Sequence, residues 1–470
     1  MGKQSKLSFE TKNILRFFES IIEILILSVI YFFFWKYGYA NENFPAFLGN
    51  GKFLLMAVYA ILAWLFIGNS EGFQIGNLRK TILATAQWIG ITITNVITYF
   101  QLCLIANKMI SPLPMVVLFI VDLFVATLLI FIYDKIFYIL YASHNMLMIY
   151  GSNNAVDMKI KLDSQKKRYN ITKLLSADIG FEKICEEIDN YESIVVNDIS
   201  PRLRNDLMKY CYEKNIRMYM VPKITDILVR GAININAVDT PMLLVKNVAL
   251  TADQRFFKRL LDIVLSSIAC IVALPFMLII MIAIKIEDGG PVFYKQTRVT
   301  ENGKEFDILK FRSMIVDAEK NGAMAATGKD PRITKVGNII RPIRFDELPQ
   351  ILNILKGDMS IVGPRPERKE YMEEYSKEIP EFKYRTKVKG GLTGYAQIYG
   401  KYNTSAYDKL RLDLMYIQNY SFLLDIKLIL LTVRILFSKD STEGFDEARK
   451  KELLREELLK QVQEDTDIKE

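Results

Sequence analysis

The segment FFKRLLDIVLSSIACIVALPFMLIIMIAIKIEDGGP, residues 256–291, decides how this chain is organised. Its apolar run from Leu261 to Ile284 is long enough to cross a bilayer, which needs about 20 apolar residues. Pro275 lies inside this run, where a proline removes a backbone hydrogen bond and kinks a helix. The sequence therefore predicts a helix at about residues 256–285 that is bent at Pro275.

Basic residues flank this helix and bear on whether it crosses the membrane. Arg255, Lys258 and Arg259 precede the apolar run, and from Lys285 to Phe345 twelve Lys and Arg residues stand against eight Asp and Glu. Positively charged segments tend to stay on the cytoplasmic side. A re-entrant helix, which dips into the membrane and returns on the same face, fits both the proline and the charges. A fifth straight span that exports the rest of the chain is the alternative.

Four more apolar segments precede this helix, at about residues 17–35, 53–68, 82–106 and 115–140. The first is too long for a cleaved signal peptide and is followed by further spans. Basic residues before it, and Arg79 and Lys80 in the second loop, place both regions inside the cell. We therefore predict a four-span transmembrane domain over residues 1–144. Asp122 in the fourth span is interpreted as a helix–helix contact or a water-facing position.

The composition excludes several kinds of chemistry. The net charge of +8 is compatible with nucleic acid, anionic lipid or phosphorylated substrates, and the membrane segments favour the last two over nucleic acid. The four cysteines are far apart, so a zinc site or a disulfide framework is not expected. With a single histidine, His144, a Ser-His or Cys-His hydrolase is not expected either. Catalysis must depend on carboxylates, Lys and Arg, with a hard cation as an optional addition.

Residues 145–250 alternate strand-like and helix-like segments, which predicts a small Rossmann-like α/β domain with a parallel sheet. Its first turn, YGSNNA, lacks the G-x-G-x-x-G pattern, so we do not expect a dinucleotide there, and an NAD-dependent sugar epimerase is disfavoured. Further on, Asn302-Gly303 predicts a β-hairpin turn. Residues 422–437 carry Asp425, Lys427 and Arg434 on an apolar helix, which suggests a helix in the membrane interface.

The stretch RFDELPQILNILKGDMSIVGPRPER, residues 344–368, holds the candidate chemistry. The spacing of Leu348, Ile351, Leu352 and Leu355 predicts an amphipathic helix that starts near residues 345–347, since Pro349 is tolerated only in a first turn. Asp346 would then lie at or near the N-cap, where backbone N–H groups favour a phosphate. One carboxylate of the pair can attack phosphorus while the other holds Mg²⁺. An ordinary N-cap aspartate is the alternative for these two residues taken alone.

Taken together, several motifs resemble the bacterial polyprenyl-phosphate sugar-phosphate transferases, which initiate capsular or exopolysaccharide synthesis. They are KRLLDIVLSSIACIVALPFM, GGPVFYKQTRVTENGKEFDILKFRSM, KVGNIIRPIRFDELPQILNILKGDMSIVGPRPE and GLTGYAQIYG, which together cover about residues 255–438. The resemblance implies a catalytic domain, residues 251–440, and the four spans and the α/β domain resemble the long form of the family. The expected fold class is therefore a four-span α-helical membrane bundle, a Rossmann-like α/β domain and a mixed α+β catalytic domain with a re-entrant helix. A charged tail, residues 441–470, would follow.

This resemblance implies a reaction and roles for individual residues. Asp346 would attack the sugar-proximal phosphorus of a UDP-sugar, UMP would leave, and undecaprenyl phosphate would then take the sugar phosphate. Glu347 would assist with Mg²⁺ as its metal ligand, and Pro275 would shape the re-entrant helix. Positions that match phosphate-binding or substrate-side residues of the family are Lys310, Arg312, Arg341, Arg365 and Gln397.

The resemblance also implies a place in the cell, namely a multi-pass protein of the bacterial cytoplasmic membrane whose catalytic domain is cytoplasmic and contacts lipid. A homodimer and proteins of polysaccharide assembly are further partners considered. The chain departs from the family pattern at Gly390, Tyr395 and Tyr399 and just before Asp346, which leaves the sugar open. A membrane scaffold whose catalytic site has lapsed is the alternative function, and a CDP-alcohol type transferase is disfavoured because its D-G-x-x-A-R pattern does not occur.

Overall fold

The computed structural model describes residues 9–39, 51–76, 78, 80–140, 145–151, 155–163, 169–245, 249–316, 330–400 and 404–436. His144 and the predicted charged tail at residues 441–470 lie outside the described residues. The chain divides into two compact units, Met1–Val221 with Phe437–Glu470, and Pro222–Leu436.

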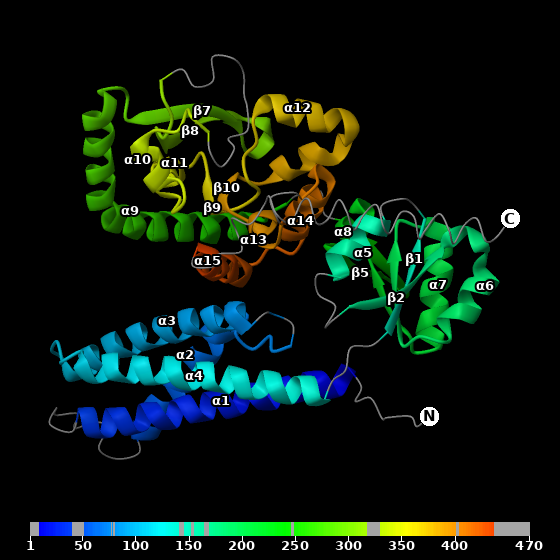
Figure 1. Ribbon diagram of the computed structural model, residues 1–470, viewed down its shortest axis with the longest axis horizontal. Coiled ribbons are helices and arrows are strands. Elements are labelled where there is room, and N and C mark those ends of the chain that lie inside the picture. Colours follow the sequence, from blue (N-terminus) through cyan, green and yellow to red (C-terminus); the bar gives the residue numbers. More distant parts are fainter. Residues whose placement is uncertain are drawn as a thin grey trace. The chain divides into compact units, whose positions relative to one another are not determined.

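The first unit begins with four long helices, α1 (Phe9–Gly38), α2 (Gly51–Asn69), α3 (Lys80–Ala106) and α4 (Leu113–Leu140), which Figure 1 shows side by side. Each helix contains an apolar stretch of 19 to 27 residues that is long enough to cross a membrane. Each packs on its neighbour along the chain, and α1 also packs on α4, so the four form a closed bundle. The prediction of four N-terminal apolar segments is confirmed.

Asp122 holds three helices of this bundle together. Its buried Oδ2 atom accepts hydrogen bonds from the Tyr59 hydroxyl on α2 at 2.9 Å and from Asn95 Nδ2 on α3 at 3.0 Å. The Tyr59 ring stacks on Tyr31 of α1, with 4.4 Å between ring centroids. The interpretation of Asp122 as a helix–helix contact is therefore confirmed, since polar groups in apolar surroundings find partners on neighbouring helices.

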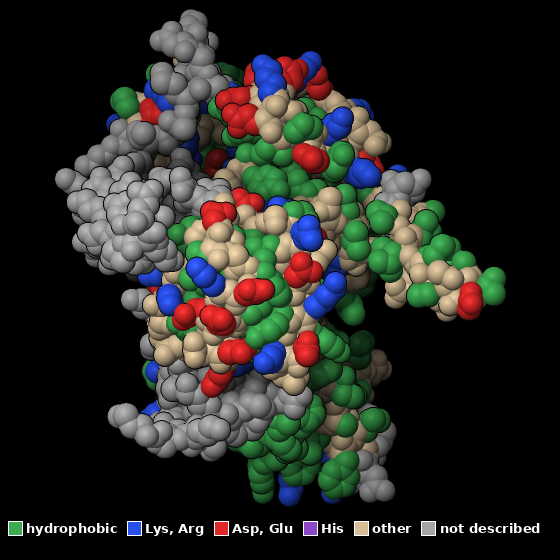
Figure 2. Space-filling view, turned by 90° about the vertical axis from the view of Figure 1, so that its right-hand side faces the viewer, with side chains coloured by type: hydrophobic (Ala, Val, Ile, Leu, Met, Phe, Trp, Pro, Cys, Tyr) green, Lys and Arg blue, Asp and Glu red, His purple; other side chains and the backbone are tan. Residues whose placement is uncertain are grey.

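The parallel α/β domain is also confirmed. Its sheet has the order β2-β1-β3-β4, with every neighbouring pair parallel. The strands are β1 (Asn145–Tyr150), β2 (Asn170–Ser176), β3 (Ser193–Asn197) and β4 (Arg217–Met220), and the accompanying helices are α5 (Ala155–Asp163), η2 (Ala177–Ile179), α6 (Phe181–Ile188) and α7 (Pro201–Glu213). Acidic and basic side chains are interspersed on the described part of this domain that faces the viewer in Figure 2, while hydrophobic side chains gather on the transmembrane helices.

Gly151 explains how the first strand of this domain ends. A Cβ atom at this position would lie 2.4 Å from the backbone oxygen of Asp198, so only glycine permits the ends of β1 and β3 to approach this closely. The glycine after MLMIY is therefore required by strand packing.

The second unit starts with α8 (Ile224–Arg230), the hairpin strands β5 (Ile233–Ala237) and β6 (Thr240–Leu244), and α9 (Ala252–Asp288). A second hairpin follows, with β7 (Phe293–Val299), η3 (Glu301–Gly303) and β8 (Glu305–Phe311). Asn302 and Gly303 both have positive φ, 58° and 77°, and the Lys304 N–H closes the turn on the Glu301 carbonyl at 3.2 Å. The predicted Asn-Gly turn is confirmed.

The remaining elements of this unit are short. They are α10 (Lys335–Ile340), η4 (Phe345–Glu347), α11 (Gln350–Lys356), β9 (Ser360–Val362), α12 (Lys369–Glu378), η5 (Pro380–Lys387), β10 (Gly391–Thr393), α13 (Tyr395–Tyr399), α14 (Ala406–Gln418) and α15 (Phe422–Leu436). β9 and β10 form a parallel pair.

The long helix α9 contains Pro275, and Figure 1 shows it as two arms that meet at a marked angle. Both arms pack on the second unit. In the N-terminal arm, Arg259 donates to the carbonyls of Ile354 and Leu355 at 2.6 and 2.7 Å. In the C-terminal arm, Ile280 and Ile284 pack in one cluster with Phe311, Ile340 and Ile351. An interior proline is the usual cause of such a bend.

Two buried polar groups anchor the N-terminal arm of α9. Lys258 Nζ lies 2.7 Å from Asp425 Oδ2, and the Tyr416 hydroxyl donates to Asp425 Oδ1 at 2.8 Å. Asp262 Oδ1 accepts from the Ser360 hydroxyl at 3.0 Å and from the Ile361 N–H at 2.9 Å. The charge of Lys258 is thus compensated by Asp425, and the buried Asp262 carboxylate is satisfied by two hydrogen bonds.

This arrangement shows where the charged residues of the predicted interfacial helix, residues 422–437, lie. Asp425 and Arg434 are buried, and so are Leu428 and Leu431, so α15 belongs to the core of the second unit. The sequence could not reveal that Asp425 has Lys258, 167 residues earlier, as its partner. Asp425 is therefore an internal contact and not part of a polar face. The same helix exposes Phe422, Leu423 and Val433, so its position in a membrane interface stays a prediction.

Candidate active site

The two adjacent carboxylates lie on a tight turn ahead of α11. The prediction that the helix starts at residues 345–347 with Asp346 at its N-cap is wrong. Phe345–Glu347 forms a 3₁₀ turn, and α11 begins at Gln350 with Pro349 in the N-cap position. Pro349 has no N–H to bond the Phe345 carbonyl four residues earlier, so the Leu348 N–H closes the turn on that carbonyl at 3.3 Å.

The buried face of α11 also differs from the predicted one. Leu352 is 38% exposed, whereas Asn353 and Ile354 are buried. The helix has only seven residues and packs on two sides, with Ile351 against α9 and Ile354 against Phe306 of β8. A single apolar stripe is therefore a poor description of it.

Asn353 is a structural residue that the sequence analysis missed. Its Nδ2 atom donates to the Asp307 carbonyl at 2.8 Å, and its Oδ1 atom accepts from the Leu309 N–H at 2.9 Å. These two bonds fix β8 against α11, which places Lys310 of β8 next to the turn that precedes α11. The only signal in the sequence was a polar residue inside an apolar helix.

Glu347 joins three segments that are far apart in the sequence. Its Oε1 atom lies 3.1 Å from Lys310 Nζ on β8 and 2.7 Å from a terminal nitrogen of Arg365 in the Gly363–Pro366 turn. That turn is held by the Gly363 N–H, which donates to the Thr393 carbonyl at 2.8 Å. We refer to Glu347, Lys310 and Arg365 as the charge triad.

The charge triad sets the protonation state of Glu347. Burial by itself would raise the pKa of this carboxyl group, but the charges of Arg365 and Lys310 outweigh burial and hold the pKa well below its usual range. Burial lowers the pKa of Lys310, and the nearby Glu347 carboxylate opposes this change. Glu347 is therefore ionised at all physiological pH values.

Asp346, the neighbouring residue, is in the opposite situation. Burial and the negative charge of Glu347 raise its pKa, while Lys310 and Arg341 act against the rise. Among the residues that the structure describes, no other side chain donates a hydrogen bond to its carboxylate. The structure thus places a partly buried carboxylate without a side-chain partner beside several cations.

The other predicted site residues fall into two groups. Arg341, at the C-terminal end of α10, is close enough to Asp346 for its charge to act on that carboxyl group. Arg312 is not part of this cluster, because it is buried in an ion pair with Asp288 at the end of α9. Gln397 lies on α13, and its buried Nε2 atom has no hydrogen-bond acceptor within the described part of the chain.

The donor atoms of this site are compatible with Mg²⁺. The described residues contain no cluster of three or more His, Cys, Asp or Glu side chains that could hold a metal ion. Magnesium, however, is usually held by one or two carboxylates together with substrate phosphates and water. Both carboxylate oxygens of Asp346, and Glu347 Oε2, are without side-chain partners among the described residues and can serve as such ligands.

Comparison with known proteins shows what this part of the chain is similar to. Residues 253–439 match the family model described as bacterial sugar transferase. They include α9, the charge triad and both carboxylates, and extend past the end of α15.

Three relatives show similar levels of identity. A UDP-glucose:undecaprenyl-phosphate glucose-1-phosphate transferase from Caulobacter vibrioides is 40% identical over 189 residues, 39% of this chain and 71% of the relative. The protein of the same name from Escherichia coli K12 is 41% identical over 198 residues, 41% of this chain and 43% of the relative. A UDP-N-acetylgalactosamine-undecaprenyl-phosphate N-acetylgalactosaminephosphotransferase from Aeromonas hydrophila is 42% identical over 186 residues, 39% of this chain and 44% of the relative. The chain thus matches less than half the length of the last two.

The opposite environments of the two carboxylates predict opposite effects of pH on stability. The pKa of Asp346 is raised in the folded protein, so ionisation of this group lowers the stability of the fold as pH rises. The Asp346→Asn variant should therefore unfold at a higher temperature than the wild type at pH 7. Glu347 has a lowered pKa, so it stabilises the fold above its unfolded pKa, and Glu347→Gln should unfold at a lower temperature at pH 7.

Thermal unfolding of the purified protein in detergent between pH 4 and pH 8 tests both expectations. The Asp346→Asn difference should shrink as pH falls toward about 4, the ordinary pKa of an aspartate, because the wild-type carboxyl group becomes increasingly protonated in both the folded and the unfolded states. If both variants changed the unfolding temperature in the same direction at pH 7, the opposite environments described for Asp346 and Glu347 would be contradicted.

Proposed function

This chain belongs to the bacterial sugar transferase family, and we propose that it transfers a sugar 1-phosphate from a UDP-sugar to undecaprenyl phosphate. The observation that carries the proposal is the charge triad beside Asp346, a carboxylate to which no other described side chain donates a hydrogen bond. Phosphoryl transfer depends mainly on positioning and on positive charge near the phosphates, and this arrangement offers both. The two substrates are those named for the relatives from E. coli and C. vibrioides.

In the first step, an Asp346 oxygen attacks the sugar-proximal phosphorus of the UDP-sugar. A bond forms between that oxygen and phosphorus, the bond between phosphorus and the UMP oxygen breaks, and UMP leaves with the electron pair. Lys310 and Arg365 stabilise the negative charge on the phosphate oxygens, and Arg341 adds a third cation. The raised pKa of Asp346 means that its surroundings stabilise the ionised carboxylate only weakly. A weakly stabilised carboxylate is a better nucleophile toward phosphorus.

In the second step, a phosphate oxygen of undecaprenyl phosphate attacks the phosphorus of the phosphosugar-aspartyl intermediate. The Asp346 carboxylate leaves, and the product is a sugar joined to the lipid through a diphosphate. Neither step needs a histidine base, which agrees with a sequence that has one histidine. This reaction would be the first membrane step in the synthesis of a capsular or exopolysaccharide.

Magnesium would supply further positive charge to the nucleotide phosphates. Glu347 Oε2 and the Asp346 carboxylate are the residues that would hold it, with substrate oxygens and water as the remaining ligands. Because Glu347 Oε1 already binds Lys310 and Arg365, this side chain would connect the metal to the two basic residues.

We infer further that α9 is re-entrant and keeps the catalytic unit on the cytoplasmic side of a bacterial membrane. Large apolar side chains of α9 are exposed along both arms, including Phe256, Ile271, Ile279 and Ile286, and lipid is the medium that would cover them. The first four helices would bring the chain back to the cytoplasm, where UDP-sugars are made. A bend within α9, with both arms packed on the same unit, supports a return to the same face.

Replacing the nucleophile tests the reaction. Asp346→Asn keeps the shape of the side chain but removes the attacking charge, so UMP release from UDP-sugars should fall by about 1,000-fold or more. The measurement is UMP release and labelling of undecaprenyl phosphate by membranes given a panel of radiolabelled UDP-sugars, which also identifies the sugar.

Asp307→Asn is the matched control, because Asp307 is a carboxylate of the same unit whose Oδ1 accepts only from the exposed Thr297 hydroxyl. Its activity should equal that of the wild type. Turnover by Asp346→Asn at a rate near that of the wild type would refute the assignment, and an inactive wild type with every sugar would favour the scaffold function.

The role of Glu347 with the metal is tested by titration with Mg²⁺. Glu347→Gln should raise the Mg²⁺ concentration needed for half-maximal activity about 10-fold or more and lower the maximal rate, since the amide is a weaker ligand for a hard cation. Unchanged half-saturation together with an unchanged rate would show that Glu347 does not bind the metal.

Single-cysteine labelling tests the topology of α9. In a cysteine-free background, cysteines at the exposed positions Lys304 and Glu186 should both be shielded from an impermeant reagent in intact cells and should react after permeabilisation. Pro275→Leu should straighten α9 and expose the Lys304 site to the outside. Labelling of the wild-type Lys304 site from outside, with Glu186 still shielded, would mean that α9 is a fifth span.

A further inference from the structure

A second buried ion pair lies behind the charge triad and has no part in the steps above. The terminal nitrogen Nη2 of Arg385 is 2.8 Å from Asp413 Oδ2, and Arg385 Nε donates to the same oxygen at 3.0 Å. The Arg385 side chain is 4% exposed and that of Asp413 is 1% exposed. Buried pairs of this kind often contribute little net stability compared with apolar residues, so stability alone is a weak reason for this pair.

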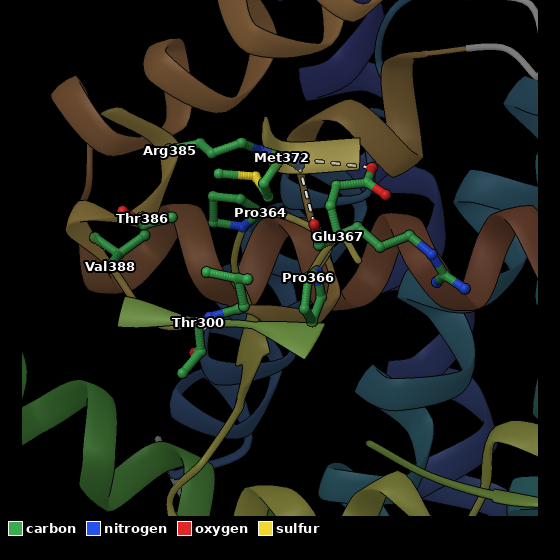
Figure 3. A pocket seen from close by; sticks show the side chains of 11 residues that line it. Thr300, Pro364, Pro366, Glu367, Met372, Arg385, Thr386 and Val388 are labelled. Carbon is green, nitrogen blue, oxygen red and sulfur yellow. Dashed lines mark hydrogen bonds and ion pairs between the residues drawn. The ribbon is translucent and has the colours of Figure 1, made fainter. Parts of the chain in front are cut away.

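Arg385 also reaches the turn that carries Arg365. Its Nη2 atom donates to the backbone carbonyl of Arg365 at 3.0 Å, and its Nη1 atom is 3.5 Å from Glu367 Oε1. Figure 3 shows Arg385 and Glu367 at a hollow that Thr300, Pro364 and Pro366 also line, with dashed lines for the bonds of Arg385. The turn therefore rests on a guanidinium group that is itself fixed by Asp413.

The bond to the Arg365 carbonyl matters because of what the Arg365 side chain does. Its guanidinium donates to Glu347 Oε1 at 2.7 Å. Fixing the peptide of Arg365 fixes the direction in which its side chain leaves the backbone, and so the geometry of the charge triad. Arg298 supports the same turn from another side, through the Pro366 carbonyl at 3.2 Å, but Arg385 is the group bonded to Arg365 itself.

The surroundings of Arg385 suit a fixed support. Its guanidinium carbon lies 4.9 Å from the centre of the Phe382 ring, and Phe382 is fully buried. Two carboxylates, Glu367 and Asp413, face it, so its charge is compensated without any substrate. These contacts of Arg385 lead to the turn, through Arg365 and Glu367, or to its own support, through Asp413 and Phe382.

We propose that Arg385, held by Asp413, is a positioning residue for the sugar-phosphate transfer and acts on the reaction only through Arg365 and the charge triad. This inference rests on the proposed function. In this role Arg385 and Asp413, which lie outside the carboxylate motif, orient the phosphate-binding guanidinium of Arg365. Their effect on the reaction should therefore disappear once the Arg365 side chain is removed.

A double-mutant cycle with Arg365→Ala and Arg385→Gln tests this role, with kcat/KM for the UDP-sugar as the readout. Arg365→Ala should lower kcat/KM about 100-fold and Arg385→Gln about 10-fold. The double variant should lie within about 2-fold of Arg365→Ala alone, because residues that act as a unit are not additive. A residue needed only for folding would instead lower kcat/KM by the same factor in both backgrounds.

Arg411→Gln is the matched control, since Arg411 is on α14 like Asp413 but bonds Asp408 at 3.0 Å and stacks on Tyr407. It should leave kcat/KM unchanged. If Arg385→Gln does not fold, Arg385→Lys keeps the charge, loses the bond to the Arg365 carbonyl, and takes its place in the cycle. If the wild type turns over and the losses of kcat/KM multiply in the double variant, this inference alone is overturned. If the wild type turns over no UDP-sugar, the proposed function is overturned.

Discussion

The arrangement of the second unit depends on one partly buried carboxylate, Glu347, that must be paired with two cations. A carboxylate taken out of water is costly unless its charge is compensated, and Lys310 and Arg365 provide that compensation from opposite directions along the chain. This requirement brings together β8, the turn before α11 and the Gly363–Pro366 turn. The bonds of Asn353 to β8 and the bond of Arg385 to the Arg365 carbonyl are the supports that let the three charges meet.

The bent helix α9 provides the frame for this cluster. Its N-terminal arm is fixed by the Lys258–Asp425 pair and by the bonds of Arg259 to the last carbonyls of α11. Its C-terminal arm packs on β8 and α10 through Ile280 and Ile284. Both arms thus support elements that carry members of the charge triad or their neighbours. A single helix with large exposed apolar side chains therefore also positions the residues of the candidate active site.

Local patterns in the sequence predicted the local features of the fold. The apolar spans, the parallel strands around MLMIY and SIVVN, and the Asn302-Gly303 turn each depend on residues that are adjacent or nearly so, and each is confirmed. The start of α11 was misplaced because the missing N–H of Pro349 acts on a carbonyl four residues earlier.

The pairs Lys258–Asp425 and Arg385–Asp413 had no sequence signal at all. The members of the two pairs are 167 and 28 residues apart in the sequence. The identity of a charged residue does not reveal whether its side chain will be buried. For the same reason Arg312, which matched a family motif, was grouped with Lys310 although it pairs with Asp288. Motif positions identified the two carboxylates, but only the packing of α9, β8 and α14 shows which cations they meet.

The two carboxylates differ because they share one set of cations unequally. Glu347 binds Lys310 and Arg365 directly, which lowers its pKa. Burial and the negative charge of Glu347 raise the pKa of Asp346, against the opposing charges of Lys310 and Arg341. The pKa values of these two adjacent groups are thus shifted in opposite directions, that of Glu347 by direct pairing with cations and that of Asp346 mainly by burial. No described side chain donates a hydrogen bond to Asp346, the preceding residue, so both of its carboxylate oxygens remain available. This asymmetry is the basis for proposing Asp346 as the nucleophile and Glu347 Oε2 as a metal ligand.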